Sequence, residues 1–89
     1  MEFRWIDWNR DHIAEHGVDW EEAETIIRLA KSPLPQQIGD EKFLVMGQGH
    51  AGKFLQVIYV LDPDDMVFVI HARPLTDHEK KHYRRRKKR

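Results

Sequence analysis

Residues 54–74, FLQVIYVLDPDDMVFVIHARP, decide the fold because they contain two apolar segments separated by a turn. Residues 54–61 are apolar almost throughout, which predicts a strand in the centre of a sheet. The turn follows directly, since Asp62 opens it and Pro63 presets φ at the next position. Residues 66–73 predict the next strand, so the two segments should pair as an antiparallel hairpin.

The flanking segments extend this hairpin into an α+β fold. Short turns join it to another predicted strand, so three strands should form an antiparallel meander with the helices packed on one face. Pro33 and Pro35 end the helix that precedes the meander. The expected order is strand 3–6, helix 9–16, a helix beginning at Asp19, strands 42–47, 54–61 and 66–73, and a helix from Thr76 toward the C-terminus.

The helix ends carry local signals of their own. Gly17 follows the first predicted helix, at a position where the left-handed backbone conformation favours glycine. Asp19 with Glu22, and Thr76 with Glu79, have the spacing of capping boxes. In such a box, side chains satisfy backbone N–H groups at the start of the helix.

Length and composition restrict the class of protein. A chain of 89 residues predicts one domain, 1–89, with 84–89 as a basic tail. The chain has no cysteine, which excludes disulfides and thiolate metal sites. We find no signal-peptide pattern and no apolar stretch approaching the roughly 20 residues of a membrane span. We therefore expect a soluble, cytoplasmic protein without a membrane partner.

The net charge of zero conceals a strong asymmetry along the chain. Residues 1–30 carry eight acidic and three basic side chains, whereas residues 71–89 carry two acidic and nine basic ones. Clustered lysine and arginine create a local positive potential, so the C-terminal end predicts binding of a polyanion, with RNA as the leading candidate. A solvated basic tail and an acidic partner protein are the alternatives.

The strand at 66–73 ends in two residues that can act on a phosphate. Alternation places Val67, Val69, His71 and Arg73 on one face. Arg73 can donate two hydrogen bonds to a phosphate, and His71 can titrate near neutral pH. The alternative for Arg73 is a structural ion pair with a carboxylate of the acidic half.

A second group of aromatic and histidine side chains lies in the first predicted helix. Trp8, His12 and His16 recur every four residues and therefore share one helix face. Residues 12–16 also match the H-x-x-E-H pattern of zinc peptidases, but a catalytic zinc needs a third ligand and a cleft, for which this small domain has little room. We therefore expect no metal site and no cofactor. A packing role for His16, between the helix and the sheet, is the alternative to a catalytic one.

Further basic residues could reach the same end of the sheet. Lys53 follows the glycine-rich turn, and the final helix contributes Lys80 and Arg84, so these three are candidate substrate-binding residues. Tyr83 in that helix can either pack on the sheet or stack on a base, and packing is the favoured interpretation.

Two segments together resemble the BrnT-type toxin family. The opening of that family, W…KHGV-x-F-x-E-A, resembles Trp8, Glu15–Val18 and Trp20–Ala23. Its closing segment, ISAR-x-x-T-x-x-E-x-x-x-Y, resembles Ile70–Thr76, Glu79–Lys80 and Tyr83. The resemblance covers nearly the whole chain.

The resemblance implies a RelE-like fold and a metal-independent endoribonuclease toxin of a type II toxin–antitoxin system. Such enzymes use the 2′-hydroxyl of the RNA as nucleophile, and a DNA-binding antitoxin encoded by the adjacent gene holds them inactive. By this resemblance Arg73 would stabilise the phosphate, His16 would transfer or position a proton, and Trp8 would stack on or enclose the substrate. His71 would add an acid–base group where the family has serine.

Two departures from the family pattern support an alternative function. Glu15 replaces the lysine before the histidine, and Gln48 replaces an arginine near the hairpin turn. Each change removes a positive charge that would attract phosphate. The alternative is a non-catalytic RNA- or partner-binding module that keeps the fold.

Overall fold

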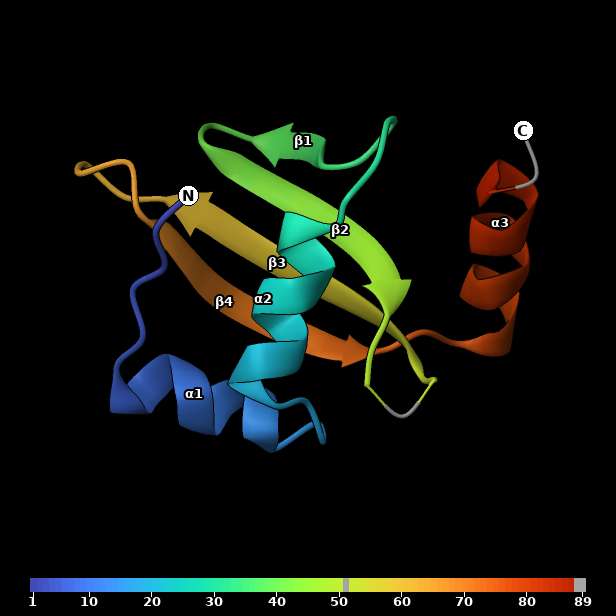
Figure 1. Cartoon of the computed structure of the whole chain (residues 1–89), viewed down its shortest axis with the longest axis horizontal. Coiled ribbons are helices and arrows are strands. Elements are labelled where there is room, and N and C mark those ends of the chain that lie inside the picture. The colour runs from blue at the N-terminus through green and yellow to red at the C-terminus, as the bar shows by residue number, and fades with distance from the viewer. Residues whose placement is uncertain (51, 88–89) are drawn as a thin grey trace.

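The computed structural model of the protein describes residues 1–50 and 52–87, with the backbone alone for 85–87. Within these residues the chain forms three helices and four strands (Figure 1). Their bounds are α1 Asp7–Ala14, α2 Trp20–Arg28, β1 Gln36–Gly39, β2 Lys42–Gln48, β3 Phe54–Leu61, β4 Val67–Pro74 and α3 Asp77–Lys87.

The strands form one antiparallel sheet in the order β1-β2-β3-β4. This confirms the α+β fold with an antiparallel meander, and β2, β3 and β4 lie within one residue of their predicted bounds. The pairing brings Arg73 opposite Gln56, and Gln56 opposite Met46. These three residues therefore lie in a row across the sheet.

The sequence-based prediction missed β1, so the three-stranded meander was incomplete. All four residues of β1 are exposed, and they pair with only the first part of β2. Because the segment Gln36–Gly39 is polar and covers no core, it lacks the apolar alternation by which a strand is recognised. The edge of β2 beyond Leu44 remains unpaired with β1.

The predicted strand at 3–6 is also wrong. Phe3 forms a single parallel bridge to Val67, supported by backbone hydrogen bonds from Arg4 N to Val67 O at 2.9 Å and from Val67 N to Glu2 O at 2.8 Å. The chain then leaves the sheet, because the N–H of Ile6 donates to Asn9 Oδ1 at 2.8 Å and begins α1.

The first helix begins and ends two residues earlier than predicted. Asn9 is completely buried, and its amide also donates to Arg4 O at 3.2 Å, which fixes the start of the helix. His16 consequently lies in the turn after α1. Gly17 has φ of 75°, as expected from its place beyond the helix end.

A β-bulge in β4 changes the predicted faces of this strand. His71 pairs with Ile58 and Val69 with Tyr59, so Ile70 is the extra residue. Val69 is buried in the core, and after the bulge Ala72 takes the core position. His71 therefore lies on the face opposite Val69, contrary to the prediction from simple alternation.

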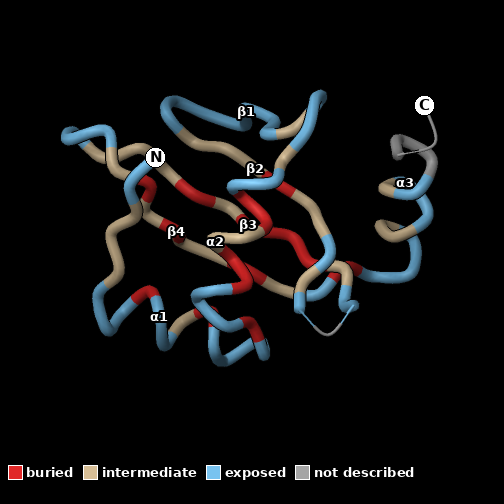
Figure 2. The backbone as a smooth tube through the Cα atoms, viewed as in Figure 1, coloured by how far each residue is buried: buried red, intermediate tan, exposed pale blue. Residues whose placement is uncertain are grey.

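One face of the sheet carries the core. The fully buried residues on this face are Val45, Val57, Val69 and Ala72. The second helix packs over them with its buried residues, among them Ile26 (Figures 1 and 2). The first helix runs alongside β4. The third helix does not pack on this face, as was predicted for the helices. It lies beyond the end of the sheet (Figure 1).

The third helix is attached by its first residues and by one aromatic contact. The N–H of Thr76 donates to Glu79 Oε1 at 2.8 Å and the N–H of Glu79 donates to Thr76 Oγ1 at 3.2 Å, which confirms the capping box. Farther along, the ring of Tyr83 meets the ring of Phe54 edge to face, with centroids 5.8 Å apart.

Candidate active site

Three histidines from α1, from the turn after it and from β4 meet on the side of β4 that faces away from the core. His12 comes from α1, His16 from the turn after it, and His71 from β4 behind the bulge. Their ring centroids lie 6.1 Å (His12–His16), 6.0 Å (His12–His71) and 5.4 Å (His16–His71) apart. We call this group the histidine cluster.

The surroundings of His16 agree with both of its sequence-based interpretations. Its side chain is exposed, and its ring lies against the other two imidazoles of the histidine cluster. Because one of these belongs to α1 and the other to β4, the ring lies at the junction of helix and sheet, as the packing alternative expects. Trp5 packs elsewhere, against Trp20, and donates to Glu24 at 2.7 Å.

An exposed tryptophan extends the histidine cluster. Trp8 stacks on His12 at 5.2 Å between centroids and on Phe68 at 6.2 Å, and 55% of its surface remains accessible. The stack orients His12 toward His71. It also leaves an aromatic surface beside the imidazoles, where a base can stack.

The environment of His71 favours its neutral form. Burial lowers its pKa below the ordinary value, and the nearby charges of His16, His12 and Arg73 lower it further. Each effect has the same sign, because both desolvation and positive neighbours disfavour the imidazolium ion. A neutral imidazole near pH 7 can accept a proton.

Arg73 points to the same face as His71 but is held by Glu79. Its two terminal nitrogens donate to the two carboxylate oxygens of Glu79, each at 2.8 Å. They also donate to Pro74 O at 3.0 Å and to Gln56 Oε1 at 3.4 Å. This pair raises the pKa of Arg73 and lowers the pKa of Glu79 to about 2.

Arg73 therefore forms a structural ion pair, as the sequence-based alternative expected, but with a different carboxylate. The carboxylate comes from α3 and not from the acidic half of the chain. Since Glu79 also caps α3, the ion pair joins the end of β4 to the start of the helix. Arg73 remains beside His71, contributing positive charge and holding α3 in place.

The other predicted substrate-binding residues lie at the same end of the sheet. Lys53 is exposed just before β3, and the pairing of Leu55 with Pro74 places this strand start beside the end of β4. The guanidinium of Arg84 lies 5.3 Å from the Phe54 ring centroid. Lys80 lies in the first turns of α3, 3.7 Å from Asp77.

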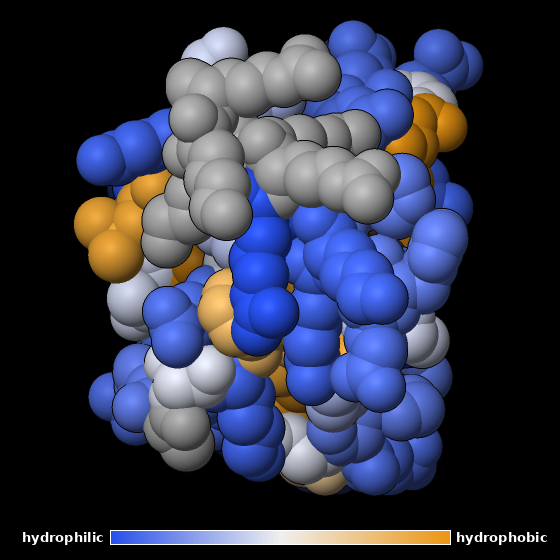
Figure 3. Space-filling view, turned by 90° about the vertical axis from the view of Figure 1, so that its right-hand side faces the viewer, coloured by the Kyte–Doolittle hydropathy of each residue, from blue (hydrophilic) through white to orange (hydrophobic). Residues whose placement is uncertain are grey.

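The surface over α3 is strongly hydrophilic, with small apolar areas between the polar side chains (Figure 3). Within the predicted tail at 84–89, the backbone of 84–87 continues α3, and residues 88–89 lie outside the described residues.

Two residues of this site were not among the predicted site residues. His12 had a signal, because it is four residues from both Trp8 and His16, but sequence alone does not place it against His71. Glu79 was predicted as a capping residue and as part of the closing family motif, but without a role at the site. Its contact with Arg73 depends on how the chain turns between β4 and α3.

No group of three or more histidine or carboxylate side chains in 1–50 and 52–87 is arranged to hold a metal ion. No helix in this part of the chain is long and apolar enough to cross a membrane.

Comparison with solved structures gives one match of direct relevance. The chain is similar to the Brucella abortus ribonuclease toxin BrnT, whose crystal structure was determined at 1.1 Å, with a TM-score of 0.66 and 20% sequence identity. The match covers 86% of this chain and 99% of the BrnT chain. No protein-family model and no curated protein matches the sequence. The chain therefore has the fold of BrnT, as the sequence resemblance implied.

Proposed function

We propose that this chain, which has the fold of the BrnT ribonuclease toxin, is an RNA-cleaving toxin that acts without a metal ion. The main support for this proposal is the histidine cluster, which lies beside Arg73 on the face of β4 opposite the core. An acid and a base at one phosphate are the groups that cleavage by the RNA's own 2′-hydroxyl requires.

His71 is the proposed base. Its lowered pKa favours the neutral imidazole, which takes the proton of the 2′-hydroxyl as O2′ attacks the adjacent phosphorus. The bond from phosphorus to O5′ breaks, and a protonated imidazole, which we assign to His16, gives its proton to that leaving oxygen. The products are a 2′,3′-cyclic phosphate and a free 5′-hydroxyl, so no covalent enzyme intermediate forms.

Positive charge and aromatic surface supply the remaining functions. Arg73 offsets the negative charge that builds up on the phosphorane-like transition state. Lys53, Lys80 and Arg84 attract the RNA backbone, and the exposed ring of Trp8 stacks on a base.

An antitoxin is the proposed partner. We infer a type II system in which a DNA-binding protein from the adjacent gene covers the site in the cytoplasm. The acidic half of this chain and the basic α3 offer it surfaces of opposite charge. Co-purification of the two proteins, with loss of cleavage in the complex, is the expected result.

The direct test is cleavage of RNA by the purified protein in excess EDTA. We expect products that end in a 2′,3′-cyclic phosphate, and no cleavage at a nucleotide whose 2′-hydroxyl is replaced by hydrogen. His71→Asn should abolish cleavage, whereas His78→Gln on the exposed side of α3 should retain it. Expression should arrest bacterial growth, and Arg73→Ala should relieve the arrest. Harmless expression of a folded, RNA-inactive wild type would overturn the proposal.

One observation favours the second candidate function, a non-catalytic RNA- or partner-binding module. The terminal nitrogens of Arg73 already donate to Glu79, Pro74 and Gln56, which leaves them fewer hydrogen bonds for a phosphate. This module would bind RNA in the same assay and release no product.

A further inference from the structure

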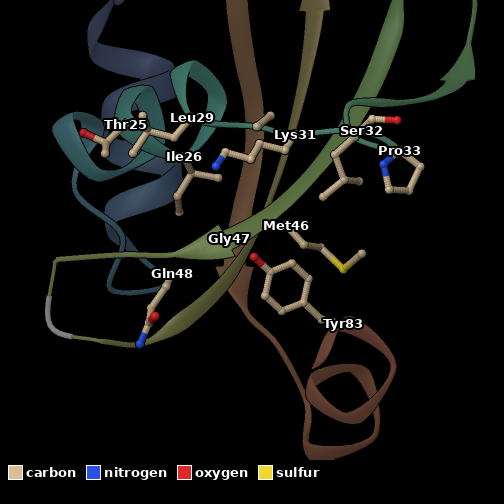
Figure 4. Close-up of a pocket in the computed structure, with 12 residues that line it drawn as sticks. Thr25, Ile26, Leu29, Lys31, Ser32, Pro33, Met46, Gly47, Gln48 and Tyr83 are labelled. Atoms are coloured by element: carbon tan, nitrogen blue, oxygen red, sulfur yellow. The ribbon is translucent and has the colours of Figure 1, made fainter. Parts of the chain in front are cut away.

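A pocket lies at the open edge of β2, on the side of the molecule that α3 occupies. Its volume is about 410 Å³. Ile26 of α2 and Leu29 directly after α2 form one wall. Met46 and Gly47 of β2 lie at the edge of the sheet, and Tyr83 reaches in from α3 (Figure 4). The pocket exists because β1 ends its pairing before this part of β2.

The lining combines apolar and polar groups in a way that suits a flat heterocycle. Leu29 is 69% exposed although it faces a pocket, so its apolar surface has no partner within the described residues. The amine of Lys31 and the side chains of Ser32 and Gln48 stand around the apolar part (Figure 4). Single-stranded RNA bases are bound in this manner, by stacking on aromatic rings and hydrogen bonding at their edges.

The sheet connects this pocket to the proposed active site. Arg73 pairs with Gln56, and Gln56 pairs with Met46 of the pocket. Two strand spacings separate the backbones of Arg73 and Met46, which amounts to about 10 Å. Met46 shares the outer face with Arg73 through this pairing, whereas Ile26 lines the pocket from the core face, so an RNA strand at Arg73 would reach the pocket around the edge of β2.

Charge favours RNA over an apolar peptide as the occupant. Tyr83 belongs to a helix whose described side chains include Lys80, Lys81 and Arg84, and Arg84 lies against Phe54 next to the Tyr83 ring. Lys31 adds a cation from the opposite wall. An RNA strand that leaves Arg73 meets these cations before its base meets the pocket.

We propose that the pocket between α2, β2 and α3 binds one nucleobase of the RNA, with Tyr83 as its aromatic wall. The inference rests on the proposed function and deepens it, because a base subsite beside the cleaved phosphate selects where cleavage occurs. Tyr83 and Met46 are then specificity-determining residues.

The test uses binding, so that it does not depend on cleavage. A short RNA with 2′-O-methyl groups cannot be cleaved by the proposed reaction, and its bases are removed one position at a time. Loss of the base in the pocket should weaken binding by about 10- to 100-fold, the range for loss of one base–aromatic stack. Base removal at positions in open solvent should have little effect.

Three variants connect this effect to the pocket. Tyr83→Leu should weaken binding of the intact RNA by a similar factor. In this variant, removal of the base at the sensitive position should then cause no additional loss of affinity. Tyr83→Phe keeps the ring and should behave as wild type. If circular dichroism shows that α3 unfolds in Tyr83→Leu, Met46→Trp is the second variant, because its side chain fills the pocket from β2. Its RNA affinity should likewise not change when the base at the sensitive position is removed.

The outcomes separate the two proposals. Binding that tolerates base removal at every position would overturn the base subsite, and so would a penalty that remains unchanged in Tyr83→Leu and Met46→Trp. Either result would favour a protein partner as the occupant of the pocket. The proposed RNA cleavage at the histidine cluster would not be contradicted by either result. A protein that binds no RNA at low salt would overturn the proposed function and the subsite together.

Discussion

The protonation of His71 depends on its burial and on positively charged neighbours that the fold brings close to it. Burial is the largest cause of its lowered pKa, followed by the charges of His16, His12 and Arg73. If His71 is the base, the cleavage rate should rise as the pH increases through this lowered pKa, since only the neutral imidazole accepts the proton.

Removing one neighbouring charge should shift that rise in a defined direction. His12→Gln takes away a group whose protonated form opposes protonation of His71, so the pKa of His71 increases and the rate profile moves to higher pH. The measurement is the initial rate of RNA cleavage against pH. His78→Gln is the matched control, and an unchanged profile in His12→Gln would contradict the role of the histidine cluster.

The Arg73–Glu79 pair makes a prediction about stability. Glu79→Gln should lower the free energy of unfolding by about 1 kcal/mol near pH 7, the size of a well-oriented but partly exposed ion pair. The pKa of Glu79 falls from 4.5 to about 2 in the folded protein, so its contribution is complete above pH 4.5 and is lost as pH falls toward 2.

Urea unfolding at several pH values measures this contribution. The difference between wild type and Glu79→Gln should shrink as the pH is lowered from 4.5 to 2. Asp77→Asn is the control, because Asp77 is exposed in the same turn and lies 3.7 Å from Lys80. An equal loss from both variants would mean that the bidentate geometry has no special value.

At the scale of elements, the bulge in β4 determines which side chains face outward. Ile70 is the residue without a partner in β3. Deleting it would leave Val69 and Ala72 on the core face and His71 and Arg73 on the outer face, because the remaining residues then alternate regularly.

We therefore expect the Ile70 deletion to retain cooperative unfolding. The measurement is the thermal transition followed by circular dichroism, with Ile70→Val as the control that keeps the bulge. A deletion variant that no longer unfolds cooperatively would show that the strand needs the extra residue.

The turn between α1 and α2 presents a milder backbone requirement. Gly17 has φ of 75°, and a Cβ added there would meet no atom within 4 Å. Gly17→Ala should thus cost about 1 kcal/mol from backbone strain alone, and Gly17→Asn less. The measurement is the urea midpoint. Gly39→Ala is the control, since a Cβ at Gly39 would make an ordinary contact with Lys42.

At the scale of the whole molecule, the separation of charge governs RNA affinity. The basic residues concentrate at one end of the chain, and α3 carries them beyond the edge of the sheet (Figure 1). Binding to RNA should weaken as salt rises, because each phosphate contact releases a counterion.

Removing residues 84–89 deletes six basic residues and should make this salt dependence less steep. For single-stranded RNA each lost contact changes the slope of log K against log salt by about 0.7. The measurement is fluorescence anisotropy between about 50 and 200 mM salt. Arg10→Gln on α1 should leave the slope unchanged, and an unaltered slope in the truncated chain would place the binding surface elsewhere.

Local sequence signals determined most of the elements of this protein. The strands β2, β3 and β4, the glycine after α1 and the cap of α3 follow from apolar runs, turn residues and capping boxes, because each depends on neighbours close in the chain. The family resemblance implied the fold that the comparison with BrnT supports. The exposed strand β1 carried no such signal, since its pairing involves only backbone groups.

Tertiary structure alone decided how the site is assembled. The pairing of β4 with β3 accommodates one extra residue, which places His71 and Arg73 on the face opposite the core. The packing of α1 beside β4 then brings His12 and His16 to His71, and the turn into α3 gives Arg73 its partner Glu79. His71 and Arg73 were recognisable from residue type and position, but their neighbours depend on contacts between segments distant in the chain.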